Sequence, residues 1–190
     1  MKNIFMVLVC LVVSFSFAAH ASREKDSHEH GAANVMLAME GEKLQLNFEV
    51  PSESLIGFEH FPKSQDQRWY FNEAIKSLLE PSKLFSIPAD AECLLVGINV
   101  SQSLFAAKDE HGHEEKDEHG HDESDKSEIH SEFISKYHWN CEHLDEIDSI
   151  GTQLMNIFPR IEEIRVRWIT KNNQGSIELE SKDDRIKGWK

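Results

Sequence analysis

Basic residues are few in this sequence: 20 lysines and arginines stand against 34 aspartates and glutamates, which gives a formal net charge of −14. No stretch gathers lysine and arginine into a basic patch. Nucleic acids and anionic membrane surfaces are recognised mainly through such patches, so we expect neither as a partner. An acidic chain favours cations instead.

Long apolar runs are also missing, apart from residues 4–17. Lys2 precedes this run and the small-x-small sequence Ala19-His20-Ala21 follows it, as in a secretory signal peptide. A membrane-spanning helix needs about 20 apolar residues, so the run is short for the alternative, an uncleaved anchor. The sequence predicts a signal peptide over 1–21, export, and no membrane attachment after cleavage.

Cysteine is scarce, and only Cys93 and Cys141 follow the predicted signal. They lack the CxxC spacing, which makes a thiolate metal pair the weaker alternative. Two cysteines in an oxidising compartment usually pair. We expect a Cys93–Cys141 disulfide, which would close a loop of roughly 50 residues and stabilise the fold by about 4 kcal/mol.

Catalytic signatures are absent as well: the sequence contains no GxSxG, no HExxH and no P-loop. A zinc hydrolase needs three ordered ligands, an open coordination position and a positioned base. We therefore expect no enzyme, with a metal-dependent periplasmic enzyme as the alternative.

Hydrophobic residues make up 39% of the chain, enough for a single α+β domain over 22–190. Apolar alternation and turn residues predict strands over 35–39, 44–50, 93–100, 133–141, 163–169 and 176–180. The strand over 93–100 is expected to be buried on at least one face. Helical spacing predicts helices over 66–79, with Asp66 as N-cap, and over 144–158. The order predicts a mainly antiparallel sheet of about six strands with two helices on one face.

Histidine is in excess, with eleven in the chain, and its placement is uneven. Residues 106–128 hold no packing apolar residue after Ala107, and the unit DEHGH occurs twice within them, at 109–113 and 117–121. We predict a disordered insert in a hairpin, hanging from paired strands that the disulfide clamps. Its candidate ligands are His111, His113, His119 and His121.

Imidazole is the commonest nitrogen ligand for zinc, copper and nickel, and nearby carboxylates can complete the shell. Glycine between two histidines lets the backbone fold around an ion at little steric cost. The repeated unit therefore predicts a capture loop with several weak, exchanging sites. The alternative is a solvated linker whose histidines bind nothing.

Four histidines outside the repeat are further candidates. His28 and His30 form an HxH unit near the predicted mature start and are either ligands or inert. His60 lies in an aromatic-rich loop with Glu59, a further candidate ligand, beside it; such a histidine can be a packing residue or a ligand. His130 lies at the base of the insert, where a ligand is expected.

Several stretches resemble the ZrgA family of periplasmic zinc-binding proteins. They are HEHGAANVMLAMEGEKLQLNFEVPSESLIGFEHFP, QRWYFNEAIKSLLEPSKLFSIPADAEC, HSEFISKYHWNC and IFPRIEEIRVRWIT. The resemblance runs from about residue 28 to the end of the sequence. It implies a Gram-negative periplasmic protein that is made under zinc limitation and assists zinc import alongside an ABC transporter.

The resemblance also indicates ordered ligands at His28, His30, His60 and His130. His30 precedes Gly31, His60 closes the motif GFEH, and His130 opens HSEF. Zinc rests on the resemblance, because the donor types alone also suit Cu²⁺ or Ni²⁺. The expected partners are metal ions and a zinc ABC importer or its binding protein, and the alternative role is a zinc-responsive adaptor for an importer.

Overall fold

The computed structural model describes residues 30–104 and 131–190. The predicted signal peptide and the predicted disordered insert lie outside the described residues, as do His28, His111, His113, His119, His121 and His130. The elements are β1 (Ala32–Glu40), β2 (Lys43–Pro51), α1 (Ser52–Ile56), α2 (Gln65–Leu78), α3 (Pro81–Leu84), β3 (Phe85–Ser86), η1 (Ala89–Ala91), β4 (Cys93–Gln102), β5 (Glu132–Cys141), η3 (Leu144–Glu146), β6 (Ser149–Thr152), α4 (Leu154–Ile157), β7 (Glu163–Thr170), β8 (Gln174–Leu179) and β9 (Arg185–Lys187).

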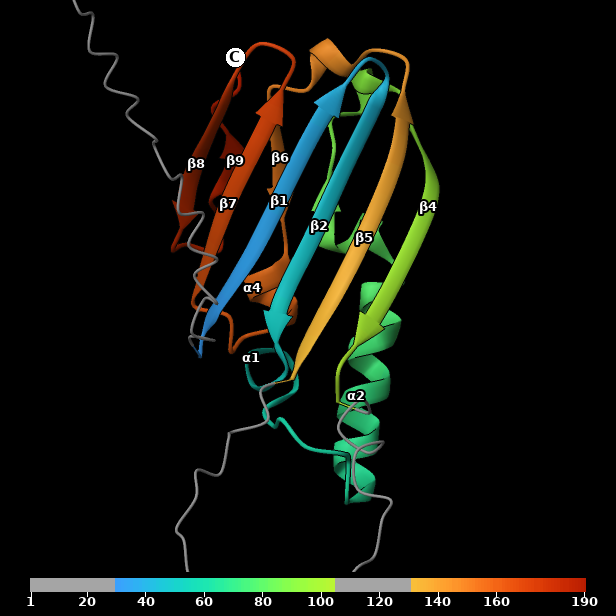
Figure 1. Cartoon of the computed structure of the whole chain (residues 1–190), viewed down its shortest axis with the longest axis vertical. Helices are drawn as coiled ribbons and strands as arrows, with labels where there is room; N and C mark the ends of the chain where they lie inside the picture. The colour runs from blue at the N-terminus through green and yellow to red at the C-terminus, as the bar shows by residue number, and fades with distance from the viewer. Residues whose placement is uncertain (1–29, 105–130) are drawn as a thin grey trace, which may run out of the picture.

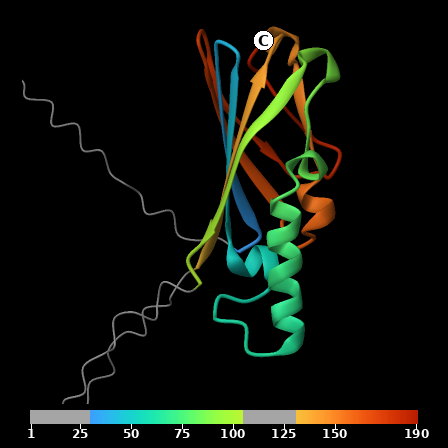
Figure 2. The ribbon, with the colours of Figure 1, turned by 90° about the vertical axis from the view of Figure 1, so that its right-hand side faces the viewer.

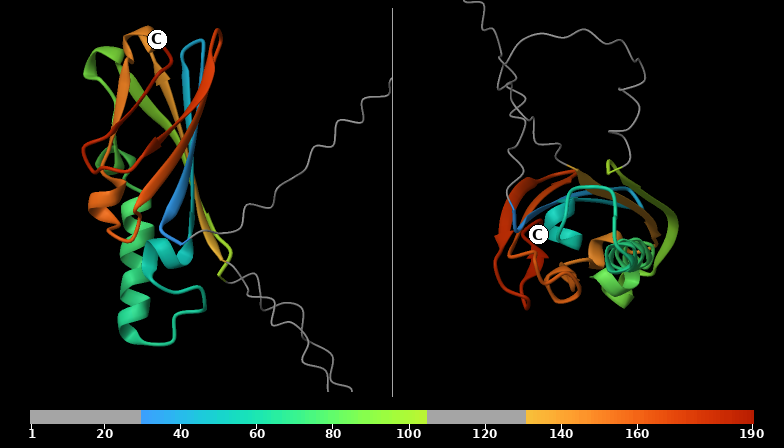
Figure 3. Two further views of the ribbon diagram at one scale, coloured as in Figure 1. Left: turned by 90° about the vertical axis from the view of Figure 1, so that its left-hand side faces the viewer. Right: turned by 90° about the horizontal axis from the view of Figure 1, so that it is seen from below.

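Two sheets organise these elements (Figure 1). The larger has the order β4-β5-β2-β1-β7-β8 and the smaller the order β3-β6-β9. Neighbouring strands are antiparallel except β1 and β7, which are parallel. The larger sheet is curved, and the helices and the smaller sheet lie on its concave side (Figure 3). The predicted α+β class, with a mainly antiparallel sheet of six strands, is confirmed.

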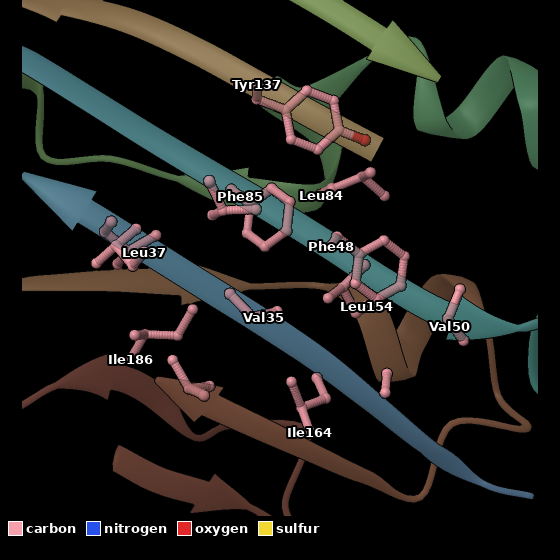
Figure 4. Packing of buried hydrophobic residues seen from close by; sticks show 14 of the residues in the cluster. Val35, Leu37, Phe48, Val50, Leu84, Phe85, Tyr137, Leu154, Ile164 and Ile186 are labelled. Atoms are coloured by element: carbon pink, nitrogen blue, oxygen red, sulfur yellow. The ribbon is translucent and has the colours of Figure 1, made fainter. Parts of the chain in front are cut away.

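The core lies between the concave face of the larger sheet and the elements that cover it (Figure 4). Alternation along β1 and β2 buries Val35 and Leu37 on one strand and Leu46 and Phe48 on the next. Each such side chain contributes roughly 1.5–3 kcal/mol by its removal from water. They pack in one cluster with residues of α3, β3, α4 and β9, namely Leu84, Phe85, Leu154 and Ile186.

The predicted helix over 66–79 is α2, but its N-cap is Ser64 rather than Asp66. The Ser64 hydroxyl accepts a hydrogen bond from the Gln67 N–H, and the Gln67 side chain accepts one from the Ser64 N–H. This reciprocal pair satisfies two N–H groups that the first turn leaves open. The first turns project beyond the sheet, so Trp69 and Tyr70 stay exposed (Figure 2). No helix in the described ranges is long and apolar enough to cross a membrane.

The strand predicted over 93–100 is β4, but the expectation of a buried face is wrong. β4 is an edge strand, and Leu94, Val96 and Ile98 are exposed. Its register with β5 shifts between Leu95 and Gly97, and such a bulge bends a strand locally. An apolar run has the same composition on an edge as in the middle of a sheet, so periodicity alone could not place this strand.

The helix predicted over 144–158 is also wrong. This segment forms the short η3, the strand β6 and one turn of α4. β6 pairs with β3 on one side and β9 on the other, with Ile150 opposite Ile186. The buried residues Ile147, Ile150 and Leu154 are three and four residues apart, as in a helix. Here the spacing arises because these short elements follow one another along the core and each turns apolar side chains towards it.

The disulfide Cys93–Cys141 is present, as predicted. The two cysteines lie directly opposite each other in the β4–β5 register. At the other end of the same strand pair, Gln102 lies opposite Phe133, so the predicted insert connects two paired antiparallel strands. The bridge and the insert are therefore at opposite ends of one hairpin.

Replacing both cysteines, Cys93→Ser with Cys141→Ser, should lower the free energy of unfolding by about 4 kcal/mol, because the unfolded chain regains the entropy of a 48-residue loop. Urea unfolding followed by circular dichroism measures this. Wild-type protein unfolded in the presence of a reductant is the control and should match the double variant. Equal midpoints for the double variant and the oxidised wild type would show that the bridge does not stabilise the fold.

Burial raises the pKa of Tyr137 from 10.0 to about 12. Its hydroxyl donates to the Leu78 carbonyl oxygen at 2.8 Å. Because the folded state holds this proton more tightly than the unfolded state, the contribution of Tyr137 to stability is complete below about pH 10 and is lost as the pH rises towards 12.

The variant Tyr137→Phe should therefore lack the phenolate absorbance step near pH 12 and unfold with about 1–2 kcal/mol less free energy at neutral pH. Ultraviolet titration and urea unfolding measure the two effects. Tyr70→Phe is the matched control, because Tyr70 is exposed. If Tyr137→Phe retained the step near pH 12, the step would not belong to Tyr137.

Candidate metal centre

The described candidate ligands lie at one end of the larger sheet. β1 begins, β2 ends and β5 begins at this end, next to α1 (Figure 1). The residues that flank the predicted insert are held together here. The Ser103 N–H donates to the Glu132 carbonyl at 3.1 Å, and the Glu132 N–H donates to the Ser103 hydroxyl at 2.9 Å. The predicted insert therefore joins the fold at the end that carries His30, Glu59 and His60.

Gly31 fixes the backbone next to His30. Its φ of 87° lies in the left-handed region, which glycine adopts at little cost. The Gly31 N–H donates to the buried Ser54 hydroxyl at 2.9 Å, and its carbonyl accepts from the N–H groups of Glu162 and Glu163. The position of His30 thus depends on α1 and on the start of β7.

The loop that carries Glu59 and His60 begins at Gly57, which ends α1. Gly57 has a φ of 85°, and its N–H donates to the Glu53 carbonyl at 2.8 Å. A Cβ at this position would come within 2.9 Å of the Arg160 guanidinium. The left-handed φ is what favours glycine in GFEH, since the flexible end of the Arg160 side chain could move to admit a Cβ.

Ser131 joins this loop to the start of β5. Its buried hydroxyl donates to the Glu59 carbonyl at 3.2 Å, and its own carbonyl accepts from the Ser52 N–H at 2.8 Å. Ser131 is the residue that follows His130 in the sequence. Its hydrogen bond to Glu59 links the insert's base to the loop of the candidate ligands.

His30 and Glu59 are candidate ligands whose donor atoms lie close together. The His30 Nε2 atom lies 4.0 Å from Glu59 Oε1, and the two side chains are 60% and 21% exposed. The carboxylate is thus largely covered, whereas the imidazole is open to solvent. A pair of one nitrogen and one oxygen donor at this separation suits a zinc ion better than a calcium or magnesium ion, which prefer oxygen alone.

The ring of His60 is held in one orientation. Its Nδ1 atom lies 2.9 Å from the Phe61 carbonyl oxygen, so in the neutral ring Nδ1 carries the proton and donates. The ring also stacks on the buried Phe58 with centroids 5.3 Å apart. Nε2 then keeps its lone pair, which is the arrangement that metal-binding histidines have when the other ring nitrogen donates to a carbonyl.

The donor atoms of His30, Glu59 and His60 do not all meet at one point. Within residues 30–104 and 131–190, only Glu92, Glu142 and His143 offer three ligand atoms within 4.8 Å of one another. His28 and His130 lie outside the described residues, so a set of ligands that includes them stays a prediction. The residues do fit zinc chemically, because imidazole nitrogen and carboxylate oxygen are its usual donors.

The sequence indicates the ligand candidates at this end but not the residues that position them. Ser54 and Ser131 carry no metal-binding motif, yet both are buried polar residues with hydrogen bonds across the site. The only sequence signal for them is that each lies inside a stretch that resembles the family. Their long-range partners could not be read from the sequence.

A family model matches most of this chain. The family model of ZrgA family zinc uptake proteins matches residues 27–188, which include the described elements from β1 to β9. A search of curated proteins finds no match. The family match spans most of the sequence and both described ranges. The chain therefore belongs to the ZrgA family of zinc uptake proteins.

Proposed function

We propose that this protein works in the periplasm as a zinc-binding accessory of zinc uptake. Its His/Asp/Glu-rich insert captures ions, and one ion is held at an ordered site whose ligands are drawn from His30, Glu59, His60 and His130. His28 is close enough in sequence to His30 to exchange with it as a ligand. Family membership supports zinc as the ion, and the donor types agree with that choice.

One observation carries the proposal: the residues that flank the insert and the candidate ligands share one end of the sheet. Ser103 is hydrogen-bonded to Glu132, and Ser131 to Glu59. Ions bound by the insert would therefore be tethered beside the ordered site. Tethering keeps the effective concentration of a ligand high, in the millimolar range for short flexible links.

The two kinds of site have different roles in this proposal. Histidines of a repeated polar tract bind ions weakly, because ordering the tract around each ion costs conformational entropy. His60 is already held by Phe58 and by the Phe61 carbonyl, so it loses less entropy on binding. Ions would be captured fast and weakly by the insert and then held more tightly at the ordered site.

Periplasmic localisation is part of the proposal. The disulfide supports it, because such bridges persist in oxidising compartments and are rare in the cytosol. The signal-like segment at residues 1–21 supports it as well. The partner that we propose is a zinc ABC importer or its binding protein, to which the ion would pass. We propose no catalytic role, since neither the sequence nor the family indicates one.

Removing the ordered imidazole should weaken the tightest zinc site. His60→Ala deletes the fixed Nε2 donor. We expect the dissociation constant of the tightest zinc site to rise at least about tenfold, because the loss of a group that merely supports a metal ligand already weakens binding by that factor. Competition with a chromogenic chelator measures this. His138→Ala is the matched control, because it also removes one histidine but lies on β5, on the face of the sheet away from the core. Equal affinities in all three proteins would rule out His60 as a ligand.

Deleting residues 109–123 should lower the number of bound zinc ions by more than one while leaving the tightest dissociation constant unchanged. Ion counts come from native mass spectrometry. The deletion should not destabilise the fold, because halving a loop lowers its closure cost by about 0.6 kcal/mol.

The matched control for the deletion keeps the loop length and replaces His111, His113, His119 and His121 with asparagine. It should lose the same ions as the deletion. An unchanged stoichiometry in both proteins would refute capture by the insert.

A further inference from the structure

A second group of metal donors lies at the other end of the β4–β5 hairpin, beside the disulfide. Glu92 precedes Cys93, and Glu142 and His143 follow Cys141. β5 runs the length of the sheet between this end and the candidate metal centre (Figure 1). At a rise of about 3.3 Å per residue, the two ends of β5 are roughly 30 Å apart, so one ion cannot touch both groups.

The backbones of these residues are joined independently of any ion. The disulfide fixes Cys93 opposite Cys141. The Glu142 N–H donates to the Glu92 carbonyl at 3.4 Å, and the His143 N–H donates to the Ala91 carbonyl at 3.2 Å. The start of β4 and the end of β5 are therefore held together where the three side chains branch off.

The side chains offer one imidazole nitrogen and two carboxylate oxygens within 4.8 Å of one another, all exposed. No ion pair joins any of the three to a lysine or arginine in the described part of the chain. Residues 87–98 and 139–150 contain no basic residue apart from histidine. Two carboxylates that close together repel each other, and a bound cation would attract both and so offset that repulsion.

We propose that Glu92, Glu142 and His143 form a second site for a divalent transition-metal ion of the zinc class. The imidazole selects against Mg²⁺ and Ca²⁺, which take oxygen ligands. Three protein donors leave the fourth position of a tetrahedral ion to water or to a donor from another molecule. Because the donors are exposed, the ion exchanges readily with solvent.

This site does not depend on the ordered site of the proposed function, because it shares no residue with it. The residues that flank the insert are at the opposite end of the hairpin. An ion here is therefore distinguishable from ions on the insert by its position along β5. The experiment must report on each position separately.

The test is a zinc titration of the full, disulfide-bonded chain followed by ¹⁵N–¹H NMR, with Zn²⁺ alone as the probe. Zinc should shift the amide signals of Glu92, Glu142 and His143. In His143→Ala the shifts at Glu92 and Glu142 should need at least about ten times more zinc, by analogy with the loss of groups around a metal. Glu142→Gln, which keeps the size of the side chain, should have the same effect.

Glu146→Gln is the matched control, because it removes an exposed acidic group near this end without touching the three donors. It should titrate as the wild type does. His60→Ala should also leave the shifts at Glu92 and Glu142 unchanged, even if it abolishes the ordered site. Absence of shifts at these residues in a large excess of zinc, or identical titrations of wild type and His143→Ala, would overturn the second site without affecting the proposed function.

Discussion

The antiparallel pairing of β4 with β5, locked by Cys93 opposite Cys141, is the constraint on which the rest of the functional architecture depends. It closes the hairpin at one end with a covalent bond. The other end is left to the long insert, whose flanking residues Ser103 and Glu132 stay hydrogen-bonded to each other. β5 in turn pairs with β2 over residues 132–140, which makes the hairpin part of the larger sheet. A polar tract can therefore be tolerated without disturbing the hydrophobic core.

At the open end of the hairpin, small polar residues and glycines hold the backbone segments in position. Gly31, Ser54 and Ser131 bring three distant segments together through hydrogen bonds to backbone groups. The side chains of His30 and His60 then remain free to face solvent, which suits an ion that must enter and leave. A zinc uptake protein needs affinity without permanent burial of its cargo, and an exposed imidazole beside a partly covered carboxylate has that character.

The two ends of the hairpin also differ in how their donors are held. At the open end the imidazole of His60 is oriented by a stacked ring and a carbonyl, but its neighbours depend on segments next to the insert. At the closed end the backbones of Glu92 and Glu142 are held by the disulfide and by hydrogen bonds. Both ends of the larger sheet therefore combine nitrogen and oxygen donors on an acidic chain.

The sequence by itself determined most strands, α2, the cysteine pair and the ligand candidates, because each leaves a local signature such as alternation, helical spacing or a motif. Only the tertiary structure decided that 144–158 is not a helix and that β4 is an exposed edge, since the same apolar spacing serves a helix, a strand or an irregular segment facing a core. It also decided that Glu92, Glu142 and His143 converge. Convergence follows from strand register, and register is fixed by contacts between residues far apart in the sequence.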